Sequence, residues 1–223
     1  MTRSRPQLSY RGPALLGRRQ EIYAPQRRIA IVCEGSCTEP YYLDGLRQEF
    51  LLSNIRVYGE ECGSDPLSVV KYALAVYRED SSIDTVYCVI DRDEHTTFNP
   101  ALQLARQERR NGVPITTIVS HPTFEYWYLL HFRFSRRTIV RTGGRSPGDN
   151  MIRSLKAEIP AYGKSDKGIF AQLKDRLPQA LTHARRARQQ ARADGEPKPS
   201  TDMDLLVSSL IKLKEERDRL GRY

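Results

Sequence analysis

Carboxylates directly follow two short, mainly apolar segments of the chain. Glu34 comes after the segment 27–33, and Asp91 and Asp93 come after the segment 85–90. Short, continuous apolar runs are typical of strands buried on both faces of a parallel sheet, and ligands bind beyond the carboxyl ends of such strands. If the two strands are neighbours, the three carboxylates converge on a volume suited to Mg²⁺ or Mn²⁺, which prefer oxygen ligands. We therefore predict a divalent-metal site.

Four further residues lie where they would assist such a site. Glu39 falls in the first turn of the helix expected after the first strand and is a candidate ligand for a second ion. His121 and Glu125 are spaced i, i+4 at the start of the fourth expected helix. His95 lies two positions beyond Asp93. These last three would support the metal ligands. A structural explanation stays open for the acidic residues, because carboxylates also stabilise helix starts and pair with neighbouring arginines.

Other reactive side chains are expected to pack or to stay reduced. His131 is six positions beyond Glu125, about 240° round a helix, so the two cannot share a face. We expect His131 to pack in the core together with Phe124, Trp127 and Leu130. The cysteines predict buried thiols rather than disulfides, zinc ligands or a nucleophile; they are Cys33, Cys37, Cys62 and Cys88.

The elements that must position these residues alternate along the chain. Short apolar runs predict the strands, and apolar residues at helical spacing predict the helices. The expected strands cover 27–33, 54–59, 85–90 and 113–119. The expected helices cover 38–52, 66–77, 100–111 and 122–132. Thr38 is expected to cap the first helix. This alternation predicts an α/β fold, a doubly wound parallel sheet of about four strands in the order 2-1-3-4.

The pattern changes after residue 132. A glycine-rich segment predicts a flexible loop over 142–150. The helices expected beyond that loop cover 151–159, 167–177, 178–193 and 201–220. We therefore predict three parts: a basic extended arm over 1–26, a core over 27–135, and a basic, mainly helical extension over 136–223.

The charge distribution favours a polyanionic partner. The formal net charge is +9, and it divides into +6 over residues 1–28, −7 over 29–131 and +10 over 132–223. An acidic centre between basic flanks suits a protein whose middle gathers divalent cations and whose ends neutralise phosphates. A solvated basic surface is the alternative.

One expected helix carries a basic stripe. Arg185, Arg188 and Arg192 follow one another at i, i+3, i+7 in the helix over 178–193 and share a face. The stripe is interpreted as a phosphate-facing surface, with a solvated helix face as the equal alternative.

The composition excludes several protein classes. An apolar fraction of 39% can fill a core, and no apolar run approaches the ~20 residues that a membrane-spanning helix needs. The arginine-rich start does not resemble a secretory signal, so a cytoplasmic location without a membrane partner is expected.

Five segments carry a specific combination of motifs. They are CEGSCTEPYYLDGL (33–46), DRDEH (91–95), HPTFEYWYLLHF (121–132), AYGKSDKG (161–168) and PSTDMDLLVSSL (199–210). This combination resembles the RloB family of bacterial proteins, roughly over residues 27–212. The resemblance implies a Toprim-like catalytic domain over 27–135 and a link to restriction and phage-defence loci.

The same resemblance implies roles for individual residues. By likeness to Toprim nucleases, Glu34, Asp91 and Asp93 would hold a divalent metal, and Glu39 is a candidate ligand for a second ion. Lys164 would contact the scissile phosphate. The sequence has no primase zinc module, and no tyrosine stands out as a topoisomerase nucleophile, so the nuclease branch is preferred. A Gly-x4-Gly-Lys-Ser/Thr loop is also lacking, so any ATPase would be a partner protein.

The resulting hypothesis is a Mg²⁺-dependent endonuclease that cuts RNA or DNA in bacterial antiphage defence. Lys164 or Lys167 would stabilise charge on the phosphate oxygens, and arginines of the flanks would hold the backbone. Two alternatives stay open. One is a non-catalytic module that binds nucleic acid or a partner within a defence complex. The other is a metal-dependent enzyme acting on a small nucleotide, which the basic flanks disfavour.

Overall fold

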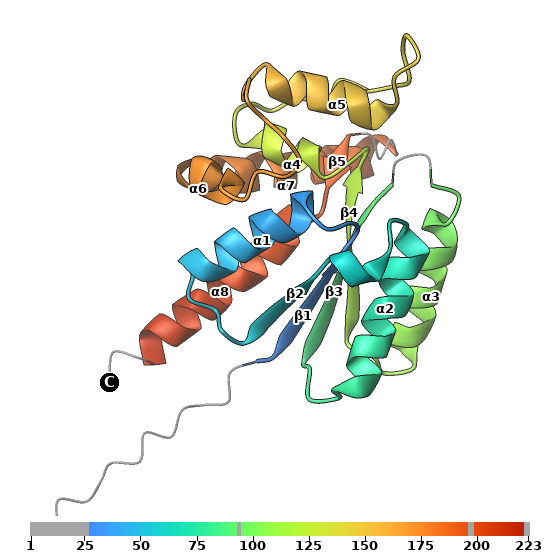
Figure 1. The fold of residues 1–223 in the computed structure, drawn as a ribbon, viewed down its shortest axis with the longest axis vertical. Coiled ribbons are helices and arrows are strands. Elements are labelled where there is room, and N and C mark those ends of the chain that lie inside the picture. The colour runs from blue at the N-terminus through green and yellow to red at the C-terminus, as the bar shows by residue number, and fades with distance from the viewer. Residues whose placement is uncertain (1–26, 93–94, 196–198, 221–223) are drawn as a thin grey trace, which may run out of the picture.

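A mostly parallel sheet forms the centre of the molecule (Figure 1). The computed structural model describes residues 27–92, 95–195 and 199–220. The strands are β1 (Ile29–Cys33), β2 (Ile55–Tyr58), β3 (Thr85–Asp91), β4 (Ile115–His121) and β5 (Ser200–Thr201). Their order is β2-β1-β3-β4-β5, and every neighbouring pair is parallel except β4 with β5. The predicted α/β fold and the order of the first four strands are confirmed.

Helices cover both faces of the sheet (Figure 1). They are α1 (Thr38–Glu49), α2 (Pro66–Glu79), α3 (Phe98–Arg110), α4 (Glu125–Leu130), α5 (Pro147–Lys156), α6 (Ile169–Leu173), α7 (Leu177–Asp194) and α8 (Met203–Leu220), with 3-10 turns η1 (Glu60–Cys62) and η2 (Lys174–Arg176). One hydrophobic cluster lies under α2 and α3. The other joins α1 with α4 to α8, so the C-terminal extension shares a core with the sheet.

Strand β1 shows why the sheet is covered on both sides. Its side chains alternate between the two clusters, because successive residues of a strand point to opposite faces. Ile29 and Ile31 belong to the cluster under α1, and Ala30 and Val32 belong to the cluster under α2. A strand buried on both faces must be apolar at every position, as β1 is.

Several elements differ from their predicted bounds. Strand β4 continues to His121, which leaves residues 122–124 for a turn, so the helix expected over 122–132 is reduced to α4. The helix expected over 167–177 divides into α6 and η2. The antiparallel strand β5 was not predicted, because two residues are too few to show a periodicity.

The starts of two helices also differ from prediction. Thr38 is the first residue of α1 rather than its cap, a position that Cys37 occupies without a capping side chain. The loop expected over 142–150 ends early, because Ser146 and Asp149 form a reciprocal capping box and Pro147 fits the first helical position. Helix α5 therefore begins inside the glycine-rich segment. The predicted arm over 1–26 lies outside the described residues.

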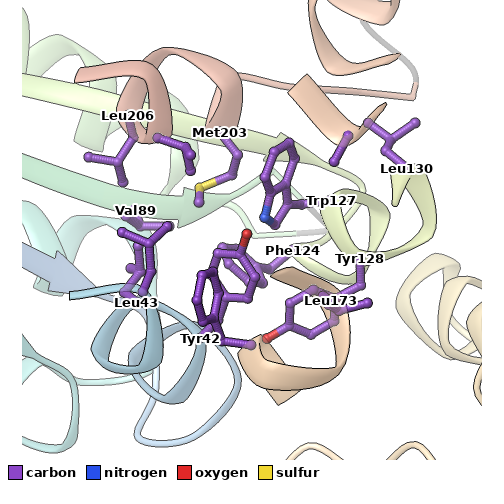
Figure 2. Close-up of a cluster of buried hydrophobic side chains, with 14 of the residues drawn as sticks. Tyr42, Leu43, Val89, Phe124, Trp127, Tyr128, Leu130, Leu173, Met203 and Leu206 are labelled. Atoms are coloured by element: carbon purple, nitrogen blue, oxygen red, sulfur yellow. The ribbon is translucent and has the colours of Figure 1, made fainter. Parts of the chain in front are cut away.

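An aromatic cluster joins α1, α4 and α6 (Figure 2). Tyr42 lies at its centre, with its ring 5.9 Å from that of Phe124 and 6.2 Å from that of Trp127 in edge-on arrangements. Phe124, Trp127, Leu130 and His131 are all buried, which confirms their predicted packing role. No helix in the described ranges has both the length and the apolar character needed to span a membrane.

Acidification is expected to destabilise the protein through His131. Burial lowers the pKa of this residue to about 4, while its Nδ1 atom donates a hydrogen bond to the Trp127 carbonyl at 3.0 Å. The folded state keeps the ring neutral, whereas the unfolded chain binds a proton below a pH of about 6.5. Stability is therefore present above pH 6.5 and is lost as the pH falls towards 4, by about 3 kcal/mol.

Urea unfolding of wild type and His131→Gln at pH 7 and pH 4 tests this expectation. The difference between the two proteins removes the contribution of the carboxylates to the loss of stability, because these carboxylates titrate in both proteins. The variant is expected to lose less stability on acidification than wild type does. Equal acid responses would assign the effect to other groups.

Candidate active site

A hollow at the carboxyl ends of the strands is lined by five carboxylates. It has a volume of about 410 Å³. We call it the acidic pocket and define it by the carboxylates of Glu34, Glu39, Asp91 and Glu125. Glu34 directly follows β1, Asp91 ends β3, Glu39 lies in the first turn of α1 and Glu125 begins α4. These four carboxylates therefore come from four separate segments, and the fifth carboxylate of the lining is Asp149 of α5.

Adjacent strands bring Glu34 and Asp91 together. The Glu34 N–H donates to the Val89 carbonyl at 3.2 Å, so Glu34 continues the pairing of β1 with β3. The Asp91 N–H then donates to Glu34 Oε2 at 3.3 Å. His95 Nε2 lies 3.1 Å from Glu34 Oε1 on the other side of the carboxylate. The predicted convergence of Glu34 and Asp91 is thus present, and both oxygens of Glu34 are positioned.

Asp91 carries one oxygen that the fold leaves unmatched. Its Oδ2 atom accepts a hydrogen bond from the Phe124 N–H at 3.2 Å. Its Oδ1 atom is buried and has no hydrogen-bond partner among the described residues. Buried carboxylate oxygens almost always have a partner, since an unsatisfied one costs about 1–3 kcal/mol or more. This oxygen has the character expected of a ligand for a cation.

The electrostatics of the pocket indicate a deficit of positive charge. Burial raises the pKa of Asp91 well above its usual range, and the charges on Glu39, Glu125 and Glu34 raise it further. Burial likewise raises the pKa of Glu39 to about 8, with added repulsion from Glu125 and Glu34. Like charges in a poorly solvated site disfavour one another's ionisation. A bound divalent cation would reverse that penalty.

Glu125 is held by residues that sequence reasoning missed. The Thr123 hydroxyl donates to Glu125 Oε2 at 2.7 Å, and the Tyr162 hydroxyl donates to Oε1 at 3.2 Å. Lys164 Nζ lies 3.9 Å from Oε1, with its side chain 62% exposed. Lys164 therefore lines the acidic pocket, and its predicted contact with a phosphate stays a prediction. Tyr162 shared a motif with Lys164, but no spacing signal linked either residue to Glu125.

The donor chemistry fits a hard divalent cation. All four carboxylates offer oxygen, which Mg²⁺ and Mn²⁺ prefer, and one of these oxygens, Asp91 Oδ1, has no hydrogen-bond partner among the described residues. Within the described ranges, no group of three or more His, Cys, Asp or Glu side chains lies close enough together to hold a metal ion. Asp93, the third predicted ligand, lies outside the described residues.

Other predicted site residues lie away from the acidic pocket. His121 is buried at the end of β4 and is not part of the pocket lining. Lys167 lies outside that lining with its ammonium over the Tyr41 ring, 5.5 Å from the centroid. Arg185 and Arg192 are exposed on α7, away from the lining of the acidic pocket.

The predicted basic stripe is interrupted at its centre. Arg188 Nη2 lies 2.7 Å from Asp204 Oδ2, and Arg188 Nε lies 3.2 Å from Asp204 Oδ1. This two-point contact joins α7 to α8, and the Asp204 side chain is only 2% exposed. Arg188 is a structural residue in this arrangement, because its guanidinium is already occupied by a carboxylate.

Cys37 is expected to be the one thiol of this chain that reacts in the native state. All four cysteines are free, and Cys33, Cys62 and Cys88 are buried, whereas Cys37 is half-buried and lines the acidic pocket. Hydrogen bonds from Ser36 and Ser165 lower the pKa of Cys37. Thiolates are the reactive form, so iodoacetamide should modify Cys37 first.

Peptide mapping by mass spectrometry, before and after denaturation, checks this expectation. Modification of Cys37 in the native protein, with Cys33, Cys62 and Cys88 modified only after denaturation, would agree with it. Labelling of a β-strand cysteine in the native protein would contradict the described burial.

Comparison with known proteins places the chain in a family. Neither the curated proteins nor the solved structures include one that matches this sequence. A family model described as RloB-like protein matches residues 29–210, which span β1 to α8 and include every described carboxylate of the acidic pocket. The chain therefore belongs to the RloB-like protein family.

Proposed function

We propose that this protein is a Mg²⁺- or Mn²⁺-dependent phosphodiesterase that cuts nucleic acid. The observation that carries the proposal is the convergence of Glu34, Asp91, Glu39 and Glu125 with Lys164 at the carboxyl ends of β1, β3 and β4. In an open α/β sheet this edge is where ligands bind. Carboxylates beside a positively charged lysine suit the cleavage of phosphate esters with the help of a divalent ion.

Each residue of the pocket has a part in this proposal. Glu34 and Asp91 would hold the ion together with Asp93, and Glu39 is the candidate ligand for a second ion. A divalent ion held by these carboxylates would neutralise phosphate charge and lower the pKa of a water molecule. Lys164 has an exposed ammonium that can contact a phosphate oxygen as charge develops there.

The surrounding residues hold the carboxylates in place. His95 fixes one oxygen of Glu34, and the Phe124 N–H fixes one oxygen of Asp91. Thr123 and Tyr162 fix both oxygens of Glu125. Preorganised groups of this kind are effective because they need little rearrangement during the reaction.

The substrate is proposed to be a polymer, RNA or DNA, cleaved within the cytoplasm as part of bacterial antiphage defence. The basic flanks on either side of the acidic centre support a polyanion rather than a mononucleotide. An ATPase partner protein would supply any nucleotide hydrolysis that regulates the nuclease, since the sequence has no P-loop of its own.

One gel experiment tests the proposal. The purified chain is incubated with mixed RNA and DNA in the presence of Mg²⁺, Mn²⁺ or EDTA. Fragments that form only with a divalent ion are expected. Binding without fragments in any condition would instead favour a non-catalytic module. If the protein neither binds nor cuts the polymers, the alternative of an enzyme that acts on a small nucleotide would be favoured.

Divalent ions are expected to stabilise the folded protein independently of catalysis. At a Mg²⁺ concentration of 100 times Kd, the added stability is about 2.7 kcal/mol, which raises Tm by roughly 5–10 °C in a chain of this size. Thermal unfolding at pH 8 with and without Mg²⁺ measures the shift. The Asp91→Asn variant should show almost no shift, whereas Asp44→Asn, on the half-buried surface of α1, should respond as wild type does. Equal shifts in all three proteins would place the ion elsewhere.

A further inference from the structure

A second hollow lies beside the acidic pocket, along α5. It has a volume of about 360 Å³ and is lined by Arg145, Asp149, Ile152, Arg153 and Lys156, and we call it the α5 groove. Asp149 and Ile152 also line the acidic pocket, so the two hollows share a wall. Figure 1 shows α5 beyond the end of the sheet at which β1, β3 and β4 finish.

Helix α5 holds the groove residues in a fixed orientation. Its four groove residues follow one another at i, i+3, i+4 and i+7, which places them on one face of the helix. Met151 and Leu155 point the other way and are buried in the core. The basic face therefore stays directed outwards, towards the groove.

The cations of the groove are not neutralised by the protein. Arg145, Arg153 and Lys156 are exposed, and none pairs with a carboxylate of the described residues. The carboxylate of Asp149 is engaged by its own helix cap, where it accepts hydrogen bonds from the Ser146 N–H at 3.0 Å and the Ser146 hydroxyl at 2.8 Å. Asp149 keeps its negative charge, so the three cations and this one anion give the groove a net positive charge beside the acidic pocket.

We propose that the α5 groove binds the sugar–phosphate backbone of a nucleic-acid strand that continues from the acidic pocket. This inference rests on the proposed function and names the surface that holds its substrate. A polyanion is repelled by a carboxylate cluster, so cations beside that cluster are needed to bring it there. The half-buried Ile152 offers an apolar contact for a sugar or a base between the charges. The α5 groove replaces the interrupted stripe on α7 as the main phosphate-binding surface.

Direct binding measurements test the groove without catalysis. The test variant is Arg145→Gln/Arg153→Gln/Lys156→Gln. The matched control is Arg106→Gln/Arg109→Gln/Arg110→Gln, which removes three exposed charges from the end of α3, near the start of β4. Fluorescent 20-nucleotide RNA and DNA strands are titrated in EDTA between 50 and 200 mM salt.

The groove variant is expected to lose at least about tenfold in affinity at 50 mM salt. The slope of log K against log salt should fall by about 2, since each lost phosphate contact on a single strand contributes about 0.7. The control should keep the wild-type slope. Thermal unfolding should be unchanged in both variants, because all six side chains are exposed.

The outcomes separate this inference from the proposed function. Equal losses in the two variants, or wild-type binding by the groove variant, would overturn the groove even if wild type cleaves with Mg²⁺. Groove-dependent binding by a protein that releases no fragments would support the groove and overturn the phosphodiesterase proposal. Absence of binding by wild type to either strand in EDTA would overturn the groove, and the cleavage gel with Mg²⁺ then decides the phosphodiesterase proposal separately.

Discussion

Replacing Asp91 with Asn is expected to reduce cleavage by at least about a thousandfold while leaving the fold intact. The amide can still accept the hydrogen bond from the Phe124 N–H, but it removes the charge that a divalent ion needs. Loss of a metal ligand removes several kcal/mol of transition-state stabilisation, and each 1.36 kcal/mol corresponds to about tenfold in rate. Cleavage rates at saturating substrate with Mg²⁺ measure the effect.

The stability of the same variant gives a second, opposite readout. Asp91 is half-buried beside three other carboxylates; loss of solvation is the main cause of its raised pKa, and repulsion from the charges on Glu39, Glu125 and Glu34 raises the pKa further. Neutralising it relieves that repulsion, so the metal-free variant should unfold at the same temperature as wild type or at a higher one at pH 8. A variant that is both inactive and unstable would show that Asp91 acts through the fold. Undiminished cleavage would remove Asp91 from the active site.

Replacing Arg188 with Met is expected to cost about 3–5 kcal/mol of stability. The change leaves Asp204 almost fully buried without its guanidinium partner, and breaking one side of a buried ion pair has this magnitude. Urea unfolding of wild type and variant measures the loss. Arg185→Met, on the exposed side of the same helix, is the matched control and should stay within about 0.5 kcal/mol.

A double variant separates the ion pair from general packing. Arg188→Met/Asp204→Leu removes both charges and should recover most of the lost stability, because the buried carboxylate is then absent. If Arg188→Met unfolds at the same urea concentration as Arg185→Met, the contact with Asp204 does not hold α7 against α8. The arginine would then be available for phosphate as the stripe suggested.

The sheet and its first two carboxylates were predictable because both depend on local patterns. Continuous apolar runs specify strands buried on both faces, and the order of parallel strands places their ends side by side. Glu34 and Asp91 each follow such a run directly. Their proximity needed only the pairing of β1 with β3, which right-handed crossovers favour.

The rest of the site depends on contacts between distant segments. Tyr162 and Lys164 reach Glu125 because the extension packs over the carboxyl end of the sheet, and no local pattern records that packing. Arg188 shows the same limit. Helical spacing predicted one face for Arg185, Arg188 and Arg192, but Arg188 is half-buried and its partner Asp204 comes from the next helix. The start of α5 was also missed. Its capping box lies within the glycine-rich segment, which was predicted to be a loop.

The short strand β5 ties the end of the chain to the centre of the molecule. Thr201 and Asp202 contact Ser120 and Val119 of β4, and α8 follows at once to complete the core. A ribosome produces β4 long before it produces these residues. The nascent chain therefore lacks a finished core until residues 200–210 have been made, and the acidic pocket lacks Lys164 until the segment after α5 has been made.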